Sequence, residues 1–337
     1  MTVTIKAANA AGFLGLVPSM LGYTPSESTI IVLFKGSRTL GCMRIDVPAP
    51  GMDLNEYAST LAGLACKKED ADGVAVIVYT ERRHDEQALA VLNSMLVRLN
   101  DCGMRIVDML YVAGDGWGSL VEGAEPRPLV QIITDPEAPP VQAGDQRAGT
   151  KLPTINETYA KDVQARIRKG PDLEALSGDM LNLIERVSTE ARPLPKDAAA
   201  LAYIIERPSL RDIAIIQWCR DSAEGERALD AQLAWEEGVE YPQELAMALW
   251  GEGSQPDPAR LERVAVNLRE LAAITSAPGV FATLAWISWA LGRSTEADHF
   301  AVQALKQDDA HGLAEIVRSF VNAGHLPAWA FAPKSNA

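Results

Sequence analysis

The pattern of apolar residues changes near the middle of the chain, at the proline- and glycine-rich stretch TDPEAPPVQAGDQRAGT, residues 134–150. Before this stretch, runs of β-branched residues alternate with helical spacing, whereas only helical spacing follows it. Such a composition is typical of a linker, and 337 residues suffice for two hydrophobic cores. We therefore expect an α/β domain over residues 1–135, a linker over 136–150 and an all-α domain over 151–337.

The first half of the chain carries the strand signals. Ile30–Phe34 and Val74–Tyr79 are uninterrupted apolar runs, as in strands covered on both faces. Cys42–Val47 alternates instead, and the short connection KGSRTLG predicts a hairpin with Ile30–Phe34. Helical spacing over Ala88–Leu99 separates Val74–Tyr79 from a further strand, Ile106–Val112. These three segments form a βαβ unit with parallel strands, so we expect a mixed, partly parallel sheet.

The second half predicts helical hairpins interrupted by prolines. In residues 282–309 the small residues fall where a pair of tetratricopeptide (TPR) type needs close helix approach: Ala285, Gly292, Ala297 and Ala304. A second copy is not found, so the sequence predicts one TPR-like pair rather than an array. Four aromatic side chains could either line a groove for a partner peptide or fill the hairpin core, which is their commoner place: Trp286, Trp289, Phe300 and Trp329.

The composition argues against several classes of function. A net charge of −14 disfavours nucleic acid as a partner. The opening MTVTIKAANAAGF is no secretory signal, and no apolar run approaches the ~20 residues of a membrane span. The four cysteines and four histidines are scattered without metal-type spacing. We expect a cytoplasmic protein with reduced thiols and without a metal or other cofactor.

The stretch VPSMLGYTPSES, residues 17–28, bends the chain into the first strand. Pro18 suits the first turn of a helix and Gly22 suits its C-terminal cap. Pro25 pre-sets a turn, in which Ser26 and Ser28 can bond neighbouring backbone groups. Each residue then has a structural task, and we interpret the stretch as aiming a strand rather than holding a ligand.

This stretch also resembles the start of an actinobacterial family, domain-of-unknown-function family 4192, through its pattern Val-Pro-x-x-Leu-Gly-aromatic-x-Pro-x-x-Ser. The matching residues are Val17, Pro18, Leu21, Gly22, Tyr23, Pro25 and Ser28. The resemblance continues through CMRIDVP, GVAVIVYT and GMRIVDMLYVAGDGWGSL, and resumes in ATLAWISWALGRSTEADHFAVQAL and NAGHLPAW. Members often carry a cysteine- and proline-rich segment where this chain has VEGAEPRPLV. The resemblance implies an actinobacterial or actinophage origin and a fold, but no catalytic residues.

Three loops are predicted at the carboxyl edge of the sheet, where open α/β sheets bind ligands. They are KGSR (Lys35–Arg38), TERRH (Thr80–His84) and GDGW (Gly114–Trp117). Arg82, Arg83 and His84 could meet an anion, Asp115 could accept from a hydroxyl, and Trp117 is a candidate for an exposed aromatic. The alternative is that TERRH is a helix N-terminal loop and GDGW a tight turn between strands.

Two hypotheses about function follow. No GxSxG, P-loop or GxGxxG motif is present, so the sequence favours a non-enzymatic interaction, scaffold or regulatory protein of an actinobacterium or its phage, with a protein partner. If phage-encoded, it would act in the host cytoplasm. The alternative is a binder of, or enzyme for, a small anionic ligand such as a nucleotide at the carboxyl edge of the N-terminal sheet.

Overall fold

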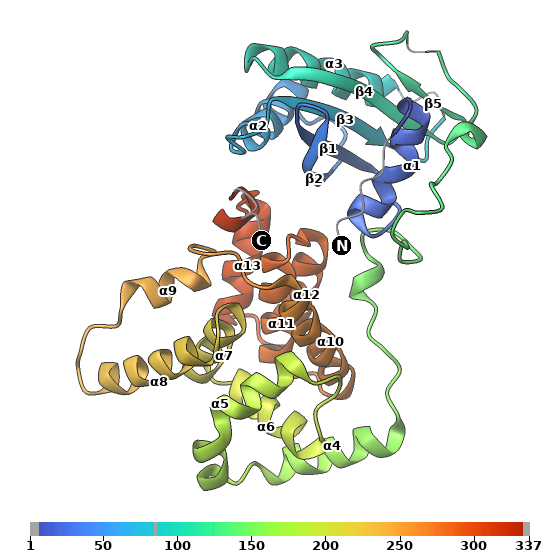
Figure 1. Cartoon of the computed structure of the whole chain (residues 1–337). Coiled ribbons are helices and arrows are strands. Elements are labelled where there is room, and N and C mark those ends of the chain that lie inside the picture. The colour runs from blue at the N-terminus through green and yellow to red at the C-terminus, as the bar shows by residue number, and fades with distance from the viewer. Residues whose placement is uncertain (1–6, 84–85, 124, 333–337) are drawn as a thin grey trace. The chain divides into compact units, whose positions relative to one another are not determined.

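Figure 1 shows the computed structural model of the chain, which describes residues 7–83, 86–123 and 125–332. The chain divides into two compact units, each with its own hydrophobic packing. We call the part up to Ala148 the N-terminal unit and the part Gly149–Ala332 the helical unit.

The N-terminal unit is built around one mixed sheet. Its elements are α1 (Ala10–Leu21), β1 (Ser28–Lys35), β2 (Arg38–Asp46), α2 (Leu54–Cys66), β3 (Gly73–Tyr79), α3 (Glu86–Asp101), β4 (Arg105–Ala113), β5 (Gly116–Ser119) and the short 3₁₀ turn η1 (Leu129–Gln131). Among the described residues the strand order is β2-β1-β3-β4-β5. β3 and β4 are parallel, and the other neighbours are antiparallel. The predicted hairpin and βαβ unit are therefore confirmed.

The two faces of this sheet are covered by different helices. Leu14 and Val17 of α1 pack against Ile30 and Val32 on one face. On the opposite face α2 and α3 pack against the side chains that alternate with these, such as Ile31. A strand covered on both faces needs apolar residues at every position, which is why β1 and β3 read as continuous apolar runs.

The stretch 17–28 forms the end of α1 and the turn into β1. Gly22 has φ 85° and caps α1, and its N–H donates to the carbonyl oxygen of Pro18 at 2.8 Å, as predicted. The placing of Pro18 in a first turn is wrong, because α1 begins eight positions earlier at Ala10. Asn9 caps that earlier start by accepting from the N–H of Gly12 at 2.9 Å.

Part of the predicted linker lies against this same stretch. The N–H of Gln142 donates to the carbonyl oxygen of Gly22 at 2.8 Å. The buried amide of Gln146 bonds the backbone of Ser26 in both directions, at 3.0 and 3.3 Å. Backbone groups left unpaired after α1 thus find partners in this segment. Residues 142–146 consequently belong to the N-terminal unit, while the domain boundaries stay a prediction.

Gly15 lets α1 lie directly on the segment that follows η1. A Cβ at Gly15 would overlap the carbonyl oxygen of Ile133, whereas a Cβ at the exposed Gly63 of α2 would meet nothing. We expect Gly15→Ala to destabilise the N-terminal unit by about 1–3 kcal/mol through overpacking. Gly63→Ala should instead stabilise by up to about 1 kcal/mol, because alanine is the better helix former. Urea denaturation measures both, and the same sign for the two variants would contradict this packing.

The helical unit begins with the short 3₁₀ turn η2 (Ala148–Thr150), which straddles the boundary at Gly149. Its helices are α4 (Glu157–Lys169), α5 (Leu173–Thr189), α6 (Pro195–Ile205), α7 (Pro208–Cys219), α8 (Ser222–Glu236), α9 (Gln243–Leu249), α10 (Pro258–Ile274), α11 (Pro278–Ala290), α12 (Ser294–Gln307) and α13 (Gly312–Asn322), followed by η3 (Ala328–Ala330). Together with the sheet of the N-terminal unit, this run of helices confirms the predicted fold class.

The centre of the helical unit is α11, in which every residue from Gly279 to Ala290 is buried. It forms a hairpin with α12 through a short turn in which Gly292 has φ 78°. The small residues Ala297 and Ala304 of α12 are fully buried, as close helix approach requires. The likeness of this hairpin to a TPR pair stays a prediction.

An ion pair between Glu185 and Arg260 joins α5 to α10, with two N–O distances of 2.5 and 2.6 Å. These hydrogen bonds are the largest cause that lowers the pKa of Glu185. The interaction that lowers this pKa stabilises the fold at neutral pH. Its contribution is lost as the pH falls through the lowered pKa of Glu185. We expect Glu185→Gln to reduce the free energy of unfolding by about 1 kcal/mol at neutral pH. Urea titrations at several pH values measure the difference in free energy of unfolding between this variant and the unaltered chain. The difference should shrink in acid, and a constant difference would contradict the linkage.

Candidate functional site

The loops after β3 and β4 lie on one rim of the sheet, but the loop Lys35–Arg38 does not. β1 runs antiparallel to β3, so the loop that follows β1 lies at the opposite end of the sheet. The prediction of three loops on one rim is therefore wrong. The register pairs Ser28 with Tyr79, which brings the turn before β1 to the rim instead.

Glu27 is the centre of this rim. Its carboxylate accepts from the N–H of Glu81 at 2.8 Å and from the hydroxyl of Thr80 at 3.2 Å. The guanidinium of Arg82 lies 3.7 Å from its other oxygen. Among the described residues other than glycine, only Glu27 has a positive φ, 43°, a conformation that costs free energy. The protein's own carboxylate thus occupies the donors that a bound anion would need.

The predicted ligand residues are distributed unevenly on the rim. Arg83 is exposed, and Arg82 is exposed but bonds Gln87 at 2.9 Å besides facing Glu27. Asp115 is half-buried in the turn between β4 and β5. His84 lies outside the described residues.

Trp117 is buried, with 2% of its surface exposed, so the expectation of an exposed tryptophan is wrong. It lies inside β5, and the guanidinium of Arg127 stands 4.8 Å from the centre of its ring. The neighbouring Gly114 approaches protein rather than ligand, because a Cβ there would overlap the carbonyl oxygen of Glu81. The alternative interpretation of GDGW is confirmed for its first half, because Gly114 and Asp115 form a tight turn between β4 and β5, and Thr80–Arg83 precede α3.

The rim yields a test of the Glu27 interactions. Glu27→Ala should destabilise the N-terminal unit by about 1 kcal/mol, because the hydroxyl of Thr80 and the N–H of Glu81 lose their acceptor. Glu27→Gln keeps an acceptor oxygen and should cost less. Thermal and urea unfolding of the two variants measure the difference, and equal losses would show that the acceptor oxygen is unimportant.

The four aromatic residues predicted for a groove or a core lie in the core. Trp286, Trp289 and Phe300 are completely buried, and Trp329 nearly so. The indole N–H groups of Trp286 and Trp289 donate to the carbonyl oxygens of Leu249 and His325, at 2.9 and 2.8 Å. The core interpretation is confirmed, and these side chains offer no surface to a partner.

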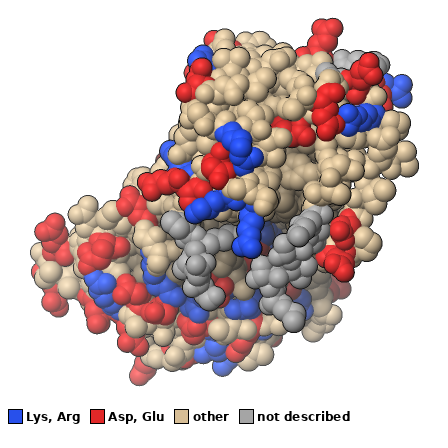
Figure 2. All heavy atoms as spheres, turned by 45° about the horizontal axis from the view of Figure 1, so that its top comes forward, with Lys and Arg blue, Asp and Glu red and all other residues tan. Residues whose placement is uncertain are grey.

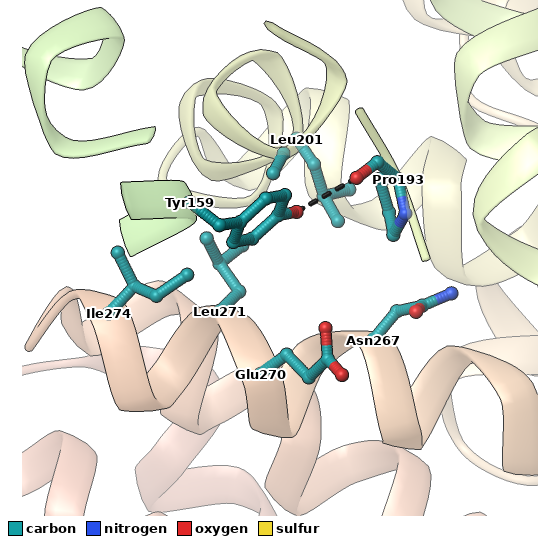
Figure 3. A pocket seen from close by; sticks show the side chains of 8 residues that line it. Tyr159, Pro193, Leu201, Asn267, Glu270, Leu271 and Ile274 are labelled. Atoms are coloured by element: carbon teal, nitrogen blue, oxygen red, sulfur yellow. Dashed lines mark hydrogen bonds between the residues drawn. The ribbon is translucent and has the colours of Figure 1, made fainter. Parts of the chain in front are cut away.

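A small pocket in the helical unit lies between α4, α6 and α10 (Figure 3). Its volume of about 10 Å³ holds roughly one water molecule. The hydroxyl of Tyr159 donates to the carbonyl oxygen of Pro193 at 2.8 Å, and burial raises the pKa of Tyr159. Glu270 is bound by Arg192 at 2.5 and 2.6 Å. The polar groups here serve the protein itself, and the space is too small for a metabolite.

Exposed apolar residues gather at the end of α8, which projects sideways from the helical unit (Figure 1). Leu229 and Ala231 pack partly against the core, and one turn further along lie Leu233 and Trp235. The exposed fractions are 53% for Leu233 and 56% for Trp235. The core therefore covers α8 in part at Leu229 and Ala231 and leaves the positions one turn further along exposed.

The backbone at this end of α8 is fixed by a Schellman motif. Gly238 has φ 93° and donates to the carbonyl oxygen of Trp235 at 2.9 Å. Val239 donates to the carbonyl oxygen of Ala234 at 3.0 Å. The motif folds Val239, which is also 56% exposed, back beside the last turn of the helix. We call Leu233, Trp235 and Val239 the α8 tip.

The α8 tip is surrounded by acidic residues. Glu236, Glu237 and Glu240 are exposed, and none of them forms an ion pair with a residue that the structure describes. The nearest cation in sequence, Arg227, pairs with Glu224 and Glu244. The tip thus combines uncovered apolar side chains with uncompensated negative charge.

On the face shown in Figure 2, Lys and Arg are interspersed with Asp and Glu, and no broad basic patch is present. Within the described ranges, no three His, Cys, Asp or Glu side chains gather closely enough to hold a metal ion. Nor does any described helix combine the length and apolarity needed to cross a bilayer.

A comparison of the chain with known protein families finds a match in the N-terminal unit. The family described as Domain of unknown function (DUF4192) matches residues 11–152. These residues form a DUF4192 domain. The match contains the stretch 17–28, as its resemblance predicted, and it also includes the rim and the segment 142–146. No curated protein and no solved structure matches the chain.

The α8 tip lies outside the DUF4192 domain, as do residues 282–305 and 322–329, for which the family likeness stays a prediction. Sequence reasoning missed both Glu27 and the α8 tip. The signal for the tip is the run AWEEGVE, in which a tryptophan stands just before a glycine helix stop among acidic residues. No comparable signal marks Glu27.

Proposed function

We propose that the chain is a non-enzymatic interaction protein, with a scaffolding or regulatory role, whose helical unit binds a protein partner at the α8 tip. The observation that carries this proposal is the exposure of Leu233 and Trp235, each one turn beyond a residue of α8 that packs partly against the core. Exposed tryptophan beside apolar neighbours is the type of surface that provides most of the binding energy of interfaces. An actinobacterial or actinophage origin, supported by the resemblance of residues 17–28, is part of the proposal.

The charge of the tip specifies the partner's chemistry. Glu236, Glu237 and Glu240 surround the apolar side chains, so the complementary surface carries Lys or Arg. Exposed apolar side chains at a helix end are complemented by a segment that presents apolar residues to them. The partner we propose is therefore a basic segment with apolar anchors.

The alternative function, binding of a small anion at the rim, has less support. Arg83 is exposed and available there, and this favours the alternative. However, the carboxylate of Glu27 already accepts from the N–H of Glu81 and the hydroxyl of Thr80. An anionic ligand would have to displace a carboxylate that is part of the same chain.

A peptide-display selection against the full-length chain tests the proposed function. We expect enrichment of peptides that combine Lys or Arg with large apolar residues. Their affinity should fall by about tenfold or more on Trp235→Ala, the loss typical of a central anchor residue. Trp250→Ala is the matched control, because Trp250 is 51% exposed elsewhere in the same unit. Enrichment of peptides that bind Trp235→Ala as well as the unaltered chain would overturn the proposal.

A further inference from the structure

Two cysteines that are far apart in the sequence meet at the surface of the N-terminal unit. β2 and β3 are both antiparallel to β1, and are therefore parallel to each other. β3 and β4 are also parallel. The helices that connect these strands, α2 and α3, therefore run in the same direction, and they lie side by side on one face of the sheet (Figure 1). Their carboxyl ends consequently lie at the same end of the sheet.

Each of these helix ends carries a cysteine. Cys66 is the last residue of α2, and Cys102 directly follows the last residue of α3. Both are exposed, and the two side chains lie close enough to interact. The other two cysteines differ, since Cys42 is half-buried and Cys219 is buried. The fold thus places one exposed pair of thiols close together.

We propose that Cys66 and Cys102 form a reversible intramolecular disulfide when the protein meets a low-molecular-weight disulfide as oxidant. One thiol loses its proton and attacks the small disulfide, which releases one small thiol and leaves a mixed disulfide on the protein. The second cysteine then displaces the other small thiol. The S–S bond of the oxidant breaks and takes up two electrons and two protons, while one S–S bond forms between α2 and α3.

Exposure of both cysteines suits a reversible bond, because exposed disulfides are more easily reduced than buried ones. Burial, followed by the interaction with Cys102, raises the pKa of the Cys66 thiol. The thiol form of Cys66 therefore predominates at neutral pH, and only its thiolate fraction attacks the oxidant. The bond forms only if the two cysteines reach disulfide geometry, with sulfur atoms about 2 Å apart. The bond would tie the ends of α2 and α3 together.

The test treats the native full-length chain with oxidised glutathione and digests it without reduction. We expect one cross-linked peptide that joins Cys66 to Cys102, and a fall in thiols from four to two in the denatured protein. Dithiothreitol should restore all four. Cys42→Ser should keep the cross-link, whereas Cys66→Ser and Cys102→Ser should each carry a mixed disulfide with glutathione instead.

Three results would overturn the proposal. These are the absence of the Cys66–Cys102 peptide from the native protein, its formation only in urea, and a link between two chains in place of the link within one. A cross-link in the native Cys42→Ser variant with the same peptide masses would support it even if the other two variants failed to fold.

Discussion

Replacing Trp289 with alanine should lower the free energy of unfolding of the helical unit by about 3–5 kcal/mol, the cost of removing a large aromatic side chain from a core. Trp289 is completely buried, and its ring lies 5.9 Å from that of Trp286 and 4.7 Å from that of Phe320. Its N–H bond to the carbonyl oxygen of His325 would also be lost. Denaturant unfolding followed by far-UV circular dichroism measures the effect.

The matched control is Trp250→Ala. Trp250 is half-exposed and its ring contacts that of Phe320 at 5.4 Å, so its loss should cost no more than about 1 kcal/mol. If Trp289→Ala were as mild as this control, the four aromatic residues would not form the core described above.

The second large effect is expected at the buried ion pair of Arg269 and Glu296. The two groups lie 2.6 Å apart, and both side chains are largely buried. Arg269 also donates to the carbonyl oxygen of Gly149 at 2.9 Å, which fixes the start of the helical unit. Arg269→Ala leaves a buried carboxylate without its partner, and we expect a loss of about 3–5 kcal/mol.

Two further variants test whether the loss in Arg269→Ala comes from the buried charge of Glu296 that is left without its partner. Replacing both partners, Arg269→Met with Glu296→Leu, should recover a large part of the loss, because no unpaired charge remains. Arg318→Ala removes a half-exposed pair with Asp298 and should cost less than about 1 kcal/mol. If Arg269→Ala were as mild as Arg318→Ala, solvent would be screening the inner pair.

Much of the fold could be predicted from local patterns. Continuous apolar runs identified β1 and β3, and the predicted Gly22 cap of α1 is present. Strand direction could not be predicted from local patterns, because an apolar run has the same sequence pattern whether its neighbours are parallel or antiparallel. The loop Lys35–Arg38 was therefore placed on the wrong rim, and the role of Glu27 was not foreseen.

The functional surfaces depend on what the fold covers, and sequence periodicity does not reveal this. Trp117 and Trp289 looked available as aromatic anchors but are buried, whereas Trp235 stands at the end of α8, which the core leaves exposed. Cys66 and Cys102 show no recognisable spacing in the sequence. Two parallel helices bring them together, and only the topology of the sheet makes those helices parallel.

The most direct test of the interaction proposal is the affinity of a selected basic peptide, measured by fluorescence anisotropy, for three variants and the unaltered chain. Trp235→Ala should weaken binding by about tenfold or more, while Trp250→Ala leaves it unchanged. Replacing Glu236, Glu237 and Glu240 together with glutamine should weaken binding at low salt and flatten its salt dependence, since salt screens exposed charges over about 10 Å at 0.1 M. Equal affinity for Trp235→Ala and the unaltered chain, with both folded, would contradict the assignment of the α8 tip as the partner site.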